Sequence, residues 1–273
     1  MNRLFPCILL SLVACSAGIT SAEEDEDEFG GFSSSNQDAD ADSDADSDAD
    51  ADSDSDADAD DGSSSPSADD DGDGFTNAEE ESAGTNPDYE YSRPYEGGYN
   101  VGWCDSPPNP TGPTGTARVD SGGEVYEWPT LRNGDVSSNF QLMDQYGEMV
   151  DLYSFCGKHV MITVSAGWCA PCRALAEDMQ SLQDRYRADD LQIIEIIMQD
   201  NTGGTPSQSF LSGWASEYGF DDIPVLQLTE PTSYDHPYFW LESDGYIPSI
   251  YHLDASMRVL SADGGVHDPG SWL

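Results

Sequence analysis

A pair of cysteines at the junction of a predicted strand and a predicted helix constrains the fold of this chain most strongly. The motif Trp168-Cys169-Ala170-Pro171-Cys172 follows an apolar run at residues 159–165, which predicts a buried strand. The segment 174–182 that comes next has the apolar spacing of a helix. Cys169 is therefore expected at a helix N-terminus, where free N–H groups and the helix dipole stabilise a thiolate. Cys172 is then placed to attack a mixed disulfide formed on Cys169.

This motif after a β-strand resembles the active site of the thioredoxin-like superfamily, in particular its extracytoplasmic TlpA/ResA-type (redoxin) members. The resemblance implies an α/β thioredoxin-like fold, a central mixed sheet flanked by helices, over residues 135–273. It also implies a thiol–disulfide oxidoreductase that needs no cofactor for catalysis and works on protein disulfide or dithiol substrates with an upstream thiol-redox partner. Cys169 and Cys172 would form the redox-active disulfide, Trp168 would shape the docking surface, and Arg173 would stabilise the thiolate.

A second resemblance to the superfamily lies near the C-terminus. Residues 245–248, Gly-Tyr-Ile-Pro, precede the segment 249–254, and Arg258-Val259-Leu260 follows after a turn. This order resembles the cis-proline loop and the final hairpin of the superfamily. A cis Pro248 would expose the Ile247 backbone for pairing with a substrate strand. The alternative is an ordinary trans proline at the start of a strand.

The remaining core is predicted from apolar patterns. The expected elements are a hairpin over residues 139–152, strands at 191–198 and 225–228, and a helix from Pro206 to Tyr218. One position departs from the family pattern. Many thioredoxins carry a buried acid six residues before the first active-site cysteine, and Thr163 stands there. Cys172 therefore needs another proton acceptor, either water or Glu195.

Three alternatives to disulfide exchange remain at the sequence level. A zinc site needs two further ligands, but the chain has no second CxxC and only four scattered histidines. A thiol peroxidase would need a Thr/Ser-x-x-Cys site, which Ser165-Ala166-Gly167-Trp168-Cys169 does not match. A non-catalytic, calcium-dependent surface-binding lipoprotein that retains the fold is the third alternative.

The charge of the chain excludes one class of partner. The net charge is −45, and the chain contains a single lysine, Lys158. Because phosphate recognition needs clusters of Lys and Arg, nucleic acid is not expected to bind. From Asp38 to Asp60 every even position is Asp. Such charge density repels itself and extends the chain, so residues 15–66 are predicted to form a disordered acidic tether.

The first residues have the form of an export signal. Arg3 precedes an apolar stretch at residues 4–13 that is too short to span a bilayer. Leu12-Val13-Ala14-Cys15 resembles a bacterial lipobox, which implies loss of residues 1–14 and lipidation of Cys15 as a membrane anchor. Ser16 in place of Asp favours the outer membrane of a bacterial cell envelope. An ordinary secretory signal, or no processing, is the alternative.

A calcium-binding pattern ends the acidic tract. Residues 69–80 fit D-x-D-x-D-G-x5-E, within a predicted calcium loop at residues 67–90. The expected oxygen ligands are Asp69, Asp71, Asp73, the Phe75 carbonyl, Asn77 and Glu80. Thr76 and Glu79 predict a capping box for a short helix ending at Gly84. The stretch resembles EF-hand-like, thrombospondin-type-3-like repeats of secreted bacterial proteins. The alternative is plain tether, because D-x-D is frequent in an Asp-rich tract.

Two further cysteines flank the predicted core. Residues 91–134 are rich in Tyr, Gly and Pro and are predicted to form an irregular N-terminal extension. Cys104 lies in this extension, and Cys156 lies just before the first core strand. In an oxidising compartment leftover cysteines tend to pair, which predicts a structural Cys104–Cys156 disulfide. A third redox cysteine is the alternative.

Overall fold

The computed structural model describes residues 67–121, 124–229, 240–241, 246–263 and 268–273. The predicted export signal, the lipidated Cys15 and the acidic tether up to residue 66 lie outside the described residues. The described residues all belong to one compact unit, which includes the predicted calcium loop, the extension and the thioredoxin-like region. Within the described part, no helix combines the length and the hydropathy that a membrane span requires.

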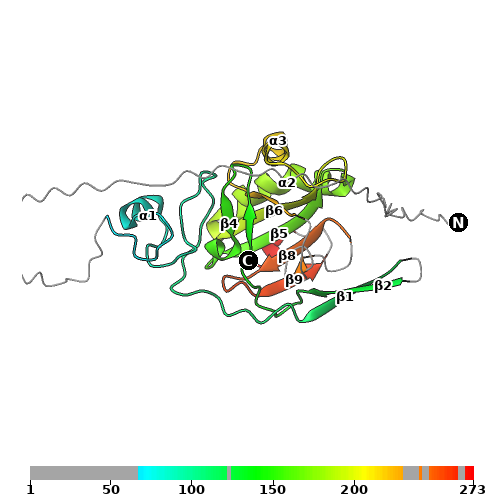
Figure 1. Cartoon of the computed structure of the whole chain (residues 1–273), viewed down its shortest axis with the longest axis horizontal. Coiled ribbons are helices and arrows are strands. Elements are labelled where there is room, and N and C mark those ends of the chain that lie inside the picture. Colours follow the sequence, from blue (N-terminus) through cyan, green and yellow to red (C-terminus); the bar gives the residue numbers. More distant parts are fainter. Residues whose placement is uncertain (1–66, 122–123, 230–239, 242–245, 264–267) are drawn as a thin grey trace, which may run out of the picture. The chain divides into compact units, whose positions relative to one another are not determined.

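A five-stranded mixed sheet forms the centre of this unit (Figure 1). Its strands are β5 (His159–Ala166), β6 (Leu191–Gln199), β7 (Val225–Gln227), β8 (Ser249–Leu253) and β9 (Val259–Asp263). The spatial order is β7-β6-β5-β8-β9, with β5, β6 and β7 parallel and β8 and β9 antiparallel to their neighbours. This arrangement confirms the expected thioredoxin-like fold.

Two helices cover one face of the sheet. They are α2 (Ala170–Tyr186), which a 3₁₀ turn, η2 (Arg187–Asp189), follows, and α3 (Gln208–Tyr218). Because strand side chains alternate between faces, Met161 and Ile193 point to these helices and pack with Met179 and Trp214. The helix predicted from residue 206 begins two residues later, because the Ser207 side chain accepts the Phe210 N–H and acts as the N-cap.

The opposite face of the sheet is covered by the N-terminal extension. Tyr89, Tyr95 and Tyr99 are buried there and belong to the same apolar cluster as Phe155 and Tyr251. The extension therefore shares one apolar core with this face of the sheet.

Two short hairpins lie outside the central sheet. The expected one consists of β3 (Gln141–Met143) and β4 (Met149–Asp151), and the 3₁₀ turn η1 (Leu152–Phe155) follows. The other, β1 (Gly115–Ser121) with β2 (Glu124–Thr130), was not predicted, so the expectation of an irregular 91–134 segment is wrong there. The short helix α1 (Asn77–Ala83) and a C-terminal 3₁₀ turn, η3 (Pro269–Ser271), complete the described elements.

Candidate functional site

Cys169 and Cys172 lie where β5 passes into α2. Cys169 is the N-cap residue of the helix, and its Sγ accepts the backbone N–H of Cys172 at 3.3 Å. The two cysteines form a disulfide with a Cα–Cα distance of 5.3 Å. Pro171 occupies the first turn, where a missing N–H leaves no hydrogen bond unmade. In the reduced state this N–H and the helix dipole would stabilise a thiolate on Cys169.

The turn before Cys169 has little room for side chains. A Cβ on Gly167 would lie 2.6 Å from Asn201 Oδ1 and 2.7 Å from Phe210 Cζ, so only glycine fits without rearrangement. The next residue, Trp168, is 49% exposed, and its indole N–H donates to Gln199 Oε1 at 2.9 Å. The indole is therefore held in one orientation beside the disulfide.

The loop before β8 reaches the disulfide from the other side. Pro248 follows a cis peptide bond with Ile247. The Ile247 carbonyl oxygen lies 3.8 Å from Cys169 Sγ, and Ile247 packs on both cysteines. Tyr246, the residue before Ile247, is 76% exposed.

Arg173 lies in the first half of α2 but differs from its expected role. Its guanidinium donates to Glu217 Oε1 at 2.8 Å, and both side chains are exposed. The structure therefore places its charge on a carboxylate of α3, and no contact with the sulfurs is present. The backbone N–H of Arg173 bonds the Cys169 carbonyl as an ordinary helix bond.

A buried carboxyl group lies on the sheet face that α2 covers. Glu195 of β6 is fully buried and lies opposite Thr163 of β5, whose hydroxyl donates to Glu195 Oε2. Burial raises the pKa of Glu195 to about 8, against the lowering effect of the Thr163 and Ser165 hydroxyls. Ser165 Oγ and Glu195 Oε1 are not aligned for a hydrogen bond and have no other partner among the described residues.

Ser165 is a second buried polar group on this side of the sheet. It lies on the same face of β5 as Thr163, one residue before Ala166, which belongs to the apolar cluster of Cys169 and Cys172. A protonated Glu195 is consistent with its burial, because an ionised carboxylate would have no counter-charge there.

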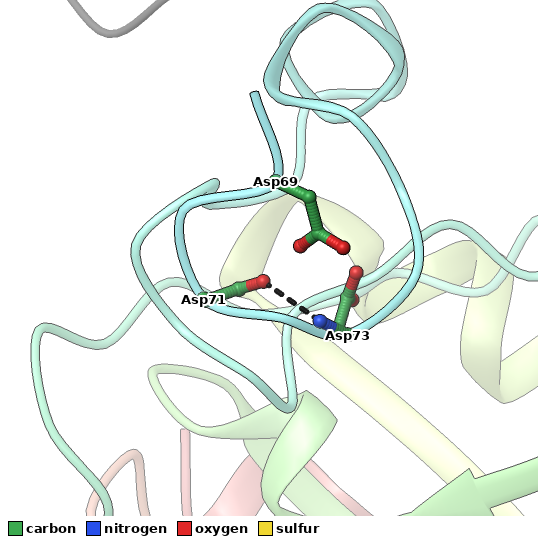
Figure 2. Close-up of side chains that lie close together, drawn as sticks. All are labelled: Asp69, Asp71 and Asp73. Carbon is green, nitrogen blue, oxygen red and sulfur yellow. Dashed lines mark hydrogen bonds between the residues drawn. The ribbon is translucent and has the colours of Figure 1, made fainter. Parts of the chain in front are cut away.

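The predicted calcium loop is folded around three carboxylates. Asp69, Asp71 and Asp73 each place one oxygen within 4.8 Å of the others, and Figure 2 shows these side chains converging inside the loop. Asp69 accepts the N–H groups of Gly72 and Gly74, both of which have positive φ angles. The glycines therefore permit the tight turn that brings the carboxylates together.

Glu80 of α1 lies close enough to this cluster for the aspartate charges to act on it. Its side chain is fully buried, and its Oε2 has no partner among the described residues, as is also true of Asp71 Oδ2 and Asp73 Oδ2. Burial, followed by the charges of Asp71 and Asp73, raises the pKa of Glu80 to about 7. Unpartnered carboxylate oxygens at close range are the donor set that Ca²⁺ prefers, so these residues fit the ion.

The remaining predicted ligands are placed differently. The Asn77 side chain accepts the Asp70 N–H and donates to Asp70 Oδ2, so it ties the start of α1 to the loop at Asp70. The Phe75 N–H donates to Asp73, which supports the loop. The capping box of Thr76 and Glu79 is present, and α1 ends at Gly84 as expected.

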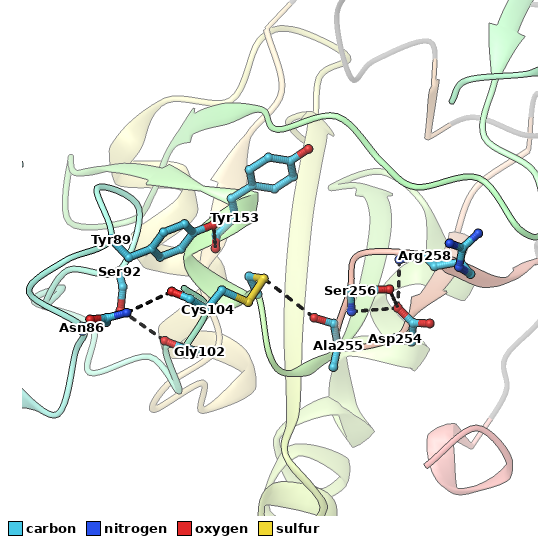
Figure 3. Close-up of a disulfide and its surroundings, with 11 residues drawn as sticks. Asn86, Tyr89, Ser92, Gly102, Cys104, Tyr153, Asp254, Ala255, Ser256 and Arg258 are labelled. Atoms are coloured by element: carbon cyan, nitrogen blue, oxygen red, sulfur yellow. Dashed lines mark hydrogen bonds between the residues drawn. A yellow bond between two sulfur atoms is a disulfide. The ribbon is translucent and has the colours of Figure 1, made fainter. Parts of the chain in front are cut away.

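Cys104 and Cys156 form the second disulfide, with a Cα–Cα distance of 5.8 Å (Figure 3). Cys156 follows η1 and is 3% exposed, whereas Cys104 is half-buried. This bond joins the extension to the start of β5. The two sulfurs are separated from the Cys169 pair in the apolar clusters of the core.

Sequence reasoning missed the partners that hold the site. Gln199 ends β6 and Asn201 follows it, and no local pattern marks them as neighbours of Trp168 and Gly167. Ser165 could have been suspected as a site residue, because it is a polar residue at the end of an apolar strand.

The chain is similar to known proteins in two regions. Residues 134–228 match the AhpC/TSA family, and residues 69–87 match the bacterial TSP3 repeat. Thioredoxin-like protein YneN of Bacillus subtilis (strain 168) is 29% identical over 96 residues, which are 35% of this chain and 54% of that protein. The chain thus spans about half the length of this curated relative.

Solved structures with related folds include a thiol:disulfide interchange protein, thioredoxin family protein, from Chlorobium tepidum TLS. It is 20% identical, with 52% of this chain and 92% of that chain covered and a TM-score of 0.40. The pneumococcal exposed lipoprotein thioredoxin (Etrx1) of Streptococcus pneumoniae strain TIGR4 is 21% identical, with 50% and 95% covered and a TM-score of 0.39.

Proposed function

We propose that this protein is a membrane-anchored, extracytoplasmic thiol–disulfide oxidoreductase that reduces or exchanges protein disulfides. The observation that carries the proposal is the Cys169–Cys172 disulfide at the N-terminus of α2, with Ile247 and Pro248 against it. A structural disulfide would not need an N-cap position that stabilises a thiolate. Similarity to the AhpC/TSA family over residues 134–228 supports the same chemistry.

The reaction proceeds by two exchange steps. In the reduced protein the Cys169 thiolate attacks a substrate disulfide, an S–S bond forms, and one substrate sulfur leaves as a thiolate. The Cys172 thiolate then attacks Cys169 Sγ and releases the second substrate sulfur. The Cys169–Cys172 disulfide that results is the state seen in the structure. An upstream dithiol partner returns two electrons and restores the reduced form.

The second step requires that Cys172 lose a proton. Glu195 is the group suited to accept it, because the pKa of about 8 for this carboxyl is close to that of an ordinary thiol. Ser165, on the same face of β5 as Thr163, offers a hydroxyl near Glu195 for the transfer. Neither group is exposed to solvent.

Insulin reduction by dithiothreitol tests the proposed activity. The chain is used without residues 1–14 and with Cys15→Ser, so that no lipid is attached. We expect catalysis by this protein and none by its Cys169→Ser variant, because the substitution removes the nucleophile. Equal rates for both proteins would contradict the proposal and favour a non-catalytic surface protein. Rapid peroxide turnover without disulfide reduction would favour a thiol peroxidase.

The membrane location rests on the sequence. We infer that residues 1–14 are removed, that Cys15 carries the lipid, and that residues 16–66 hold the redox domain away from the outer membrane. Detergent phase partition of the expressed chain tests this inference. The chain should enter the detergent phase and its Cys15→Ser variant should stay in water, whereas equal partition would contradict lipidation.

A second function is favoured by the carboxylate cluster. We propose that residues 69–80 bind Ca²⁺ through Asp69, Asp71, Asp73 and Glu80, because oxygens of the three aspartates converge and Glu80 is buried without a partner for Oε2 among the described residues. Similarity of residues 69–87 to the bacterial TSP3 repeat agrees with this assignment. Calorimetric titration should show one site that Glu80→Gln weakens at least about tenfold. Unchanged binding in that variant would reject Glu80 as a ligand.

A further inference from the structure

The Cys104–Cys156 disulfide is covered by the segment that begins in the calcium loop. Gly102 donates its N–H to the Ser154 carbonyl at 2.8 Å, and a Cβ at Gly102 would lie 1.8 Å from the Cys156 carbonyl oxygen. A Cβ at Gly157 would lie 2.7 Å from the Trp103 carbonyl oxygen. The backbone just before Cys104 is therefore pressed against the backbone around Cys156, and lifting this segment would open the buried Cys156 Sγ to a reductant.

A buried hydrogen-bond path leads from the cluster to this disulfide. Thr85 Oγ1 donates to the carbonyl oxygen of Glu80 and lies 3.3 Å from Glu80 Oε1. The next residue, Asn86, donates its side-chain N–H to the Cys104 carbonyl at 2.9 Å, as Figure 3 shows. Its backbone N–H donates to Ser92 Oγ, and this hydroxyl donates to Gly102 at 3.2 Å.

The members of this path before Cys104 are buried. Glu80, Thr85, Asn86 and Ser92 are each at most 3% exposed. Such bonds have no ready replacement from solvent, so displacing Glu80 disturbs Thr85 and Asn86 directly. Glu80 is thus at once a proposed ligand of the calcium site and the first member of the path that holds Cys104.

The cluster brings like charges together. One oxygen each of Asp69, Asp71 and Asp73 lies within 4.8 Å of the others, so these carboxylates repel one another when no cation is bound. Three carboxylate oxygens in this group lack partners among the described residues. A divalent cation would replace this repulsion by attraction and would fix Glu80 in the position from which Thr85 is held.

From these contacts we propose that Ca²⁺ in the 69–80 loop locks the segment through Cys104 and so protects the Cys104–Cys156 disulfide from reduction. The inference rests on the calcium site proposed above and adds a regulatory consequence to it. A protein that exchanges disulfides would thereby keep its own structural disulfide oxidised wherever calcium is abundant and would release it where calcium is scarce.

The size of the effect follows from linkage. When opening requires the ion to leave, bound ligand lowers the open population by the factor 1 + [Ca²⁺]/Kd, which is about 100-fold at 100 times the Kd. Reduction that proceeds through this opening slows by the same factor. If the segment opens with the ion still bound, calcium does not change the reduction rate. The effect of calcium on that rate therefore measures how strongly ion binding and opening are coupled.

The test follows reduction of the Cys104–Cys156 bond alone. The chain is used without residues 1–14, with Cys15→Ser and with Cys169→Ser and Cys172→Ser, so that a single disulfide remains. Reduction by dithiothreitol is quenched with an alkylating agent and counted by mass, in excess CaCl₂ or in excess chelator, with MgCl₂ as the ion control. Calorimetry on the same sample measures calcium binding.

Calcium should slow reduction by at least about tenfold, and Glu80→Gln should abolish the difference. Thr85→Val keeps all four proposed ligands and cuts the path, so it should still bind calcium yet lose most of the protection. Calcium binding with a reduction rate unchanged within about twofold would overturn the inference and leave the site intact. No binding at up to about 10 mM calcium would overturn both, because extracellular modules bind at or below about 1 mM.

Discussion

Replacing Glu195 by Gln should remove a pH dependence from the stability of the protein. The carboxyl has an ordinary pKa of 4.5 in the unfolded chain and about 8 in the fold. Because the folded value is the higher one, the native state holds the proton more tightly. The contribution to stability is complete below pH 4.5 and is lost as the pH rises toward 8.

The magnitude follows from the same two values. Between pH 5 and pH 7 the native carboxyl stays mostly protonated while the unfolded one ionises, which costs about 1.4 kcal/mol per pH unit. The free energy of unfolding of the wild type should therefore fall by about 3 kcal/mol over this interval relative to that of Glu195→Gln. Any constant cost of placing an amide beside Thr163 shifts the variant at every pH equally and leaves this slope unaffected.

Urea unfolding of the oxidised protein at several pH values between 5 and 8 gives the slope as a difference between two proteins. Other titrating groups, including the histidines and the calcium-loop carboxylates, cancel in that difference. Glu177→Gln is the matched control, because Glu177 is an exposed carboxylate on α2. The difference in unfolding free energy between this variant and the wild type should not change with pH. If the difference in unfolding free energy between Glu195→Gln and the wild type is also independent of pH, the carboxyl in this core is not protonated and the reasoning is refuted.

Three further predictions concern the site and the loop. In a Cys172→Ser variant, the Cys169 thiol should be alkylated with a midpoint below the ordinary thiol pKa of about 8.5, and a midpoint at or above that value would refute thiolate stabilisation by the helix. Glu195→Gln should slow release of a mixed disulfide about 100-fold at neutral pH while leaving the first exchange step unchanged, and equal slowing of both steps would argue against a proton acceptor. Thr76→Ala removes the N-cap of α1 and should lower the free energy of unfolding in urea by about 1 kcal/mol, with no change expected only if the capping box does not form in solution.

Local signals predicted the centre of the domain. The strand, the turn and the helix were each predicted and are each present: the apolar run forms β5, Pro171 lies in the first turn of α2, and the apolar spacing that follows forms the rest of α2. The same holds for α1, whose capping box and terminal Gly84 were readable from the sequence. These elements were predictable because their start and stop residues lie within a few positions of each other.

The hairpin of β1 and β2 was missed although its signal was present. Residues 115–121 and 124–130 alternate around Gly122-Gly123, a pair that favours a two-residue hairpin loop. The abundance of Tyr, Gly and Pro in the surrounding segment led to an expectation of irregular structure. Composition over 40 residues is a weaker guide than a turn pair with alternation on both sides.

Contacts between distant segments could not be read from the sequence. Tyr89, Tyr95 and Tyr99 become core residues only because the extension folds over the sheet. Glu195 is conspicuous in an apolar run, but its pairing with Thr163 depends on the register of two parallel strands. Arg173 shows the opposite error, because its position after the motif suggested the sulfurs while Glu217 of α3 takes its charge.

Trapping of the mixed disulfide tests most directly whether Cys169 is the nucleophile and Cys172 the resolving cysteine. The reduced Cys172→Ser and Cys169→Ser variants are each mixed with a peptide that contains one disulfide, and the products are measured by intact mass. We predict that Cys172→Ser accumulates one peptide per protein through Cys169, since no thiol remains to release it. Cys169→Ser should remain largely free. Equal labelling of the two variants, or labelling of neither, would contradict the account.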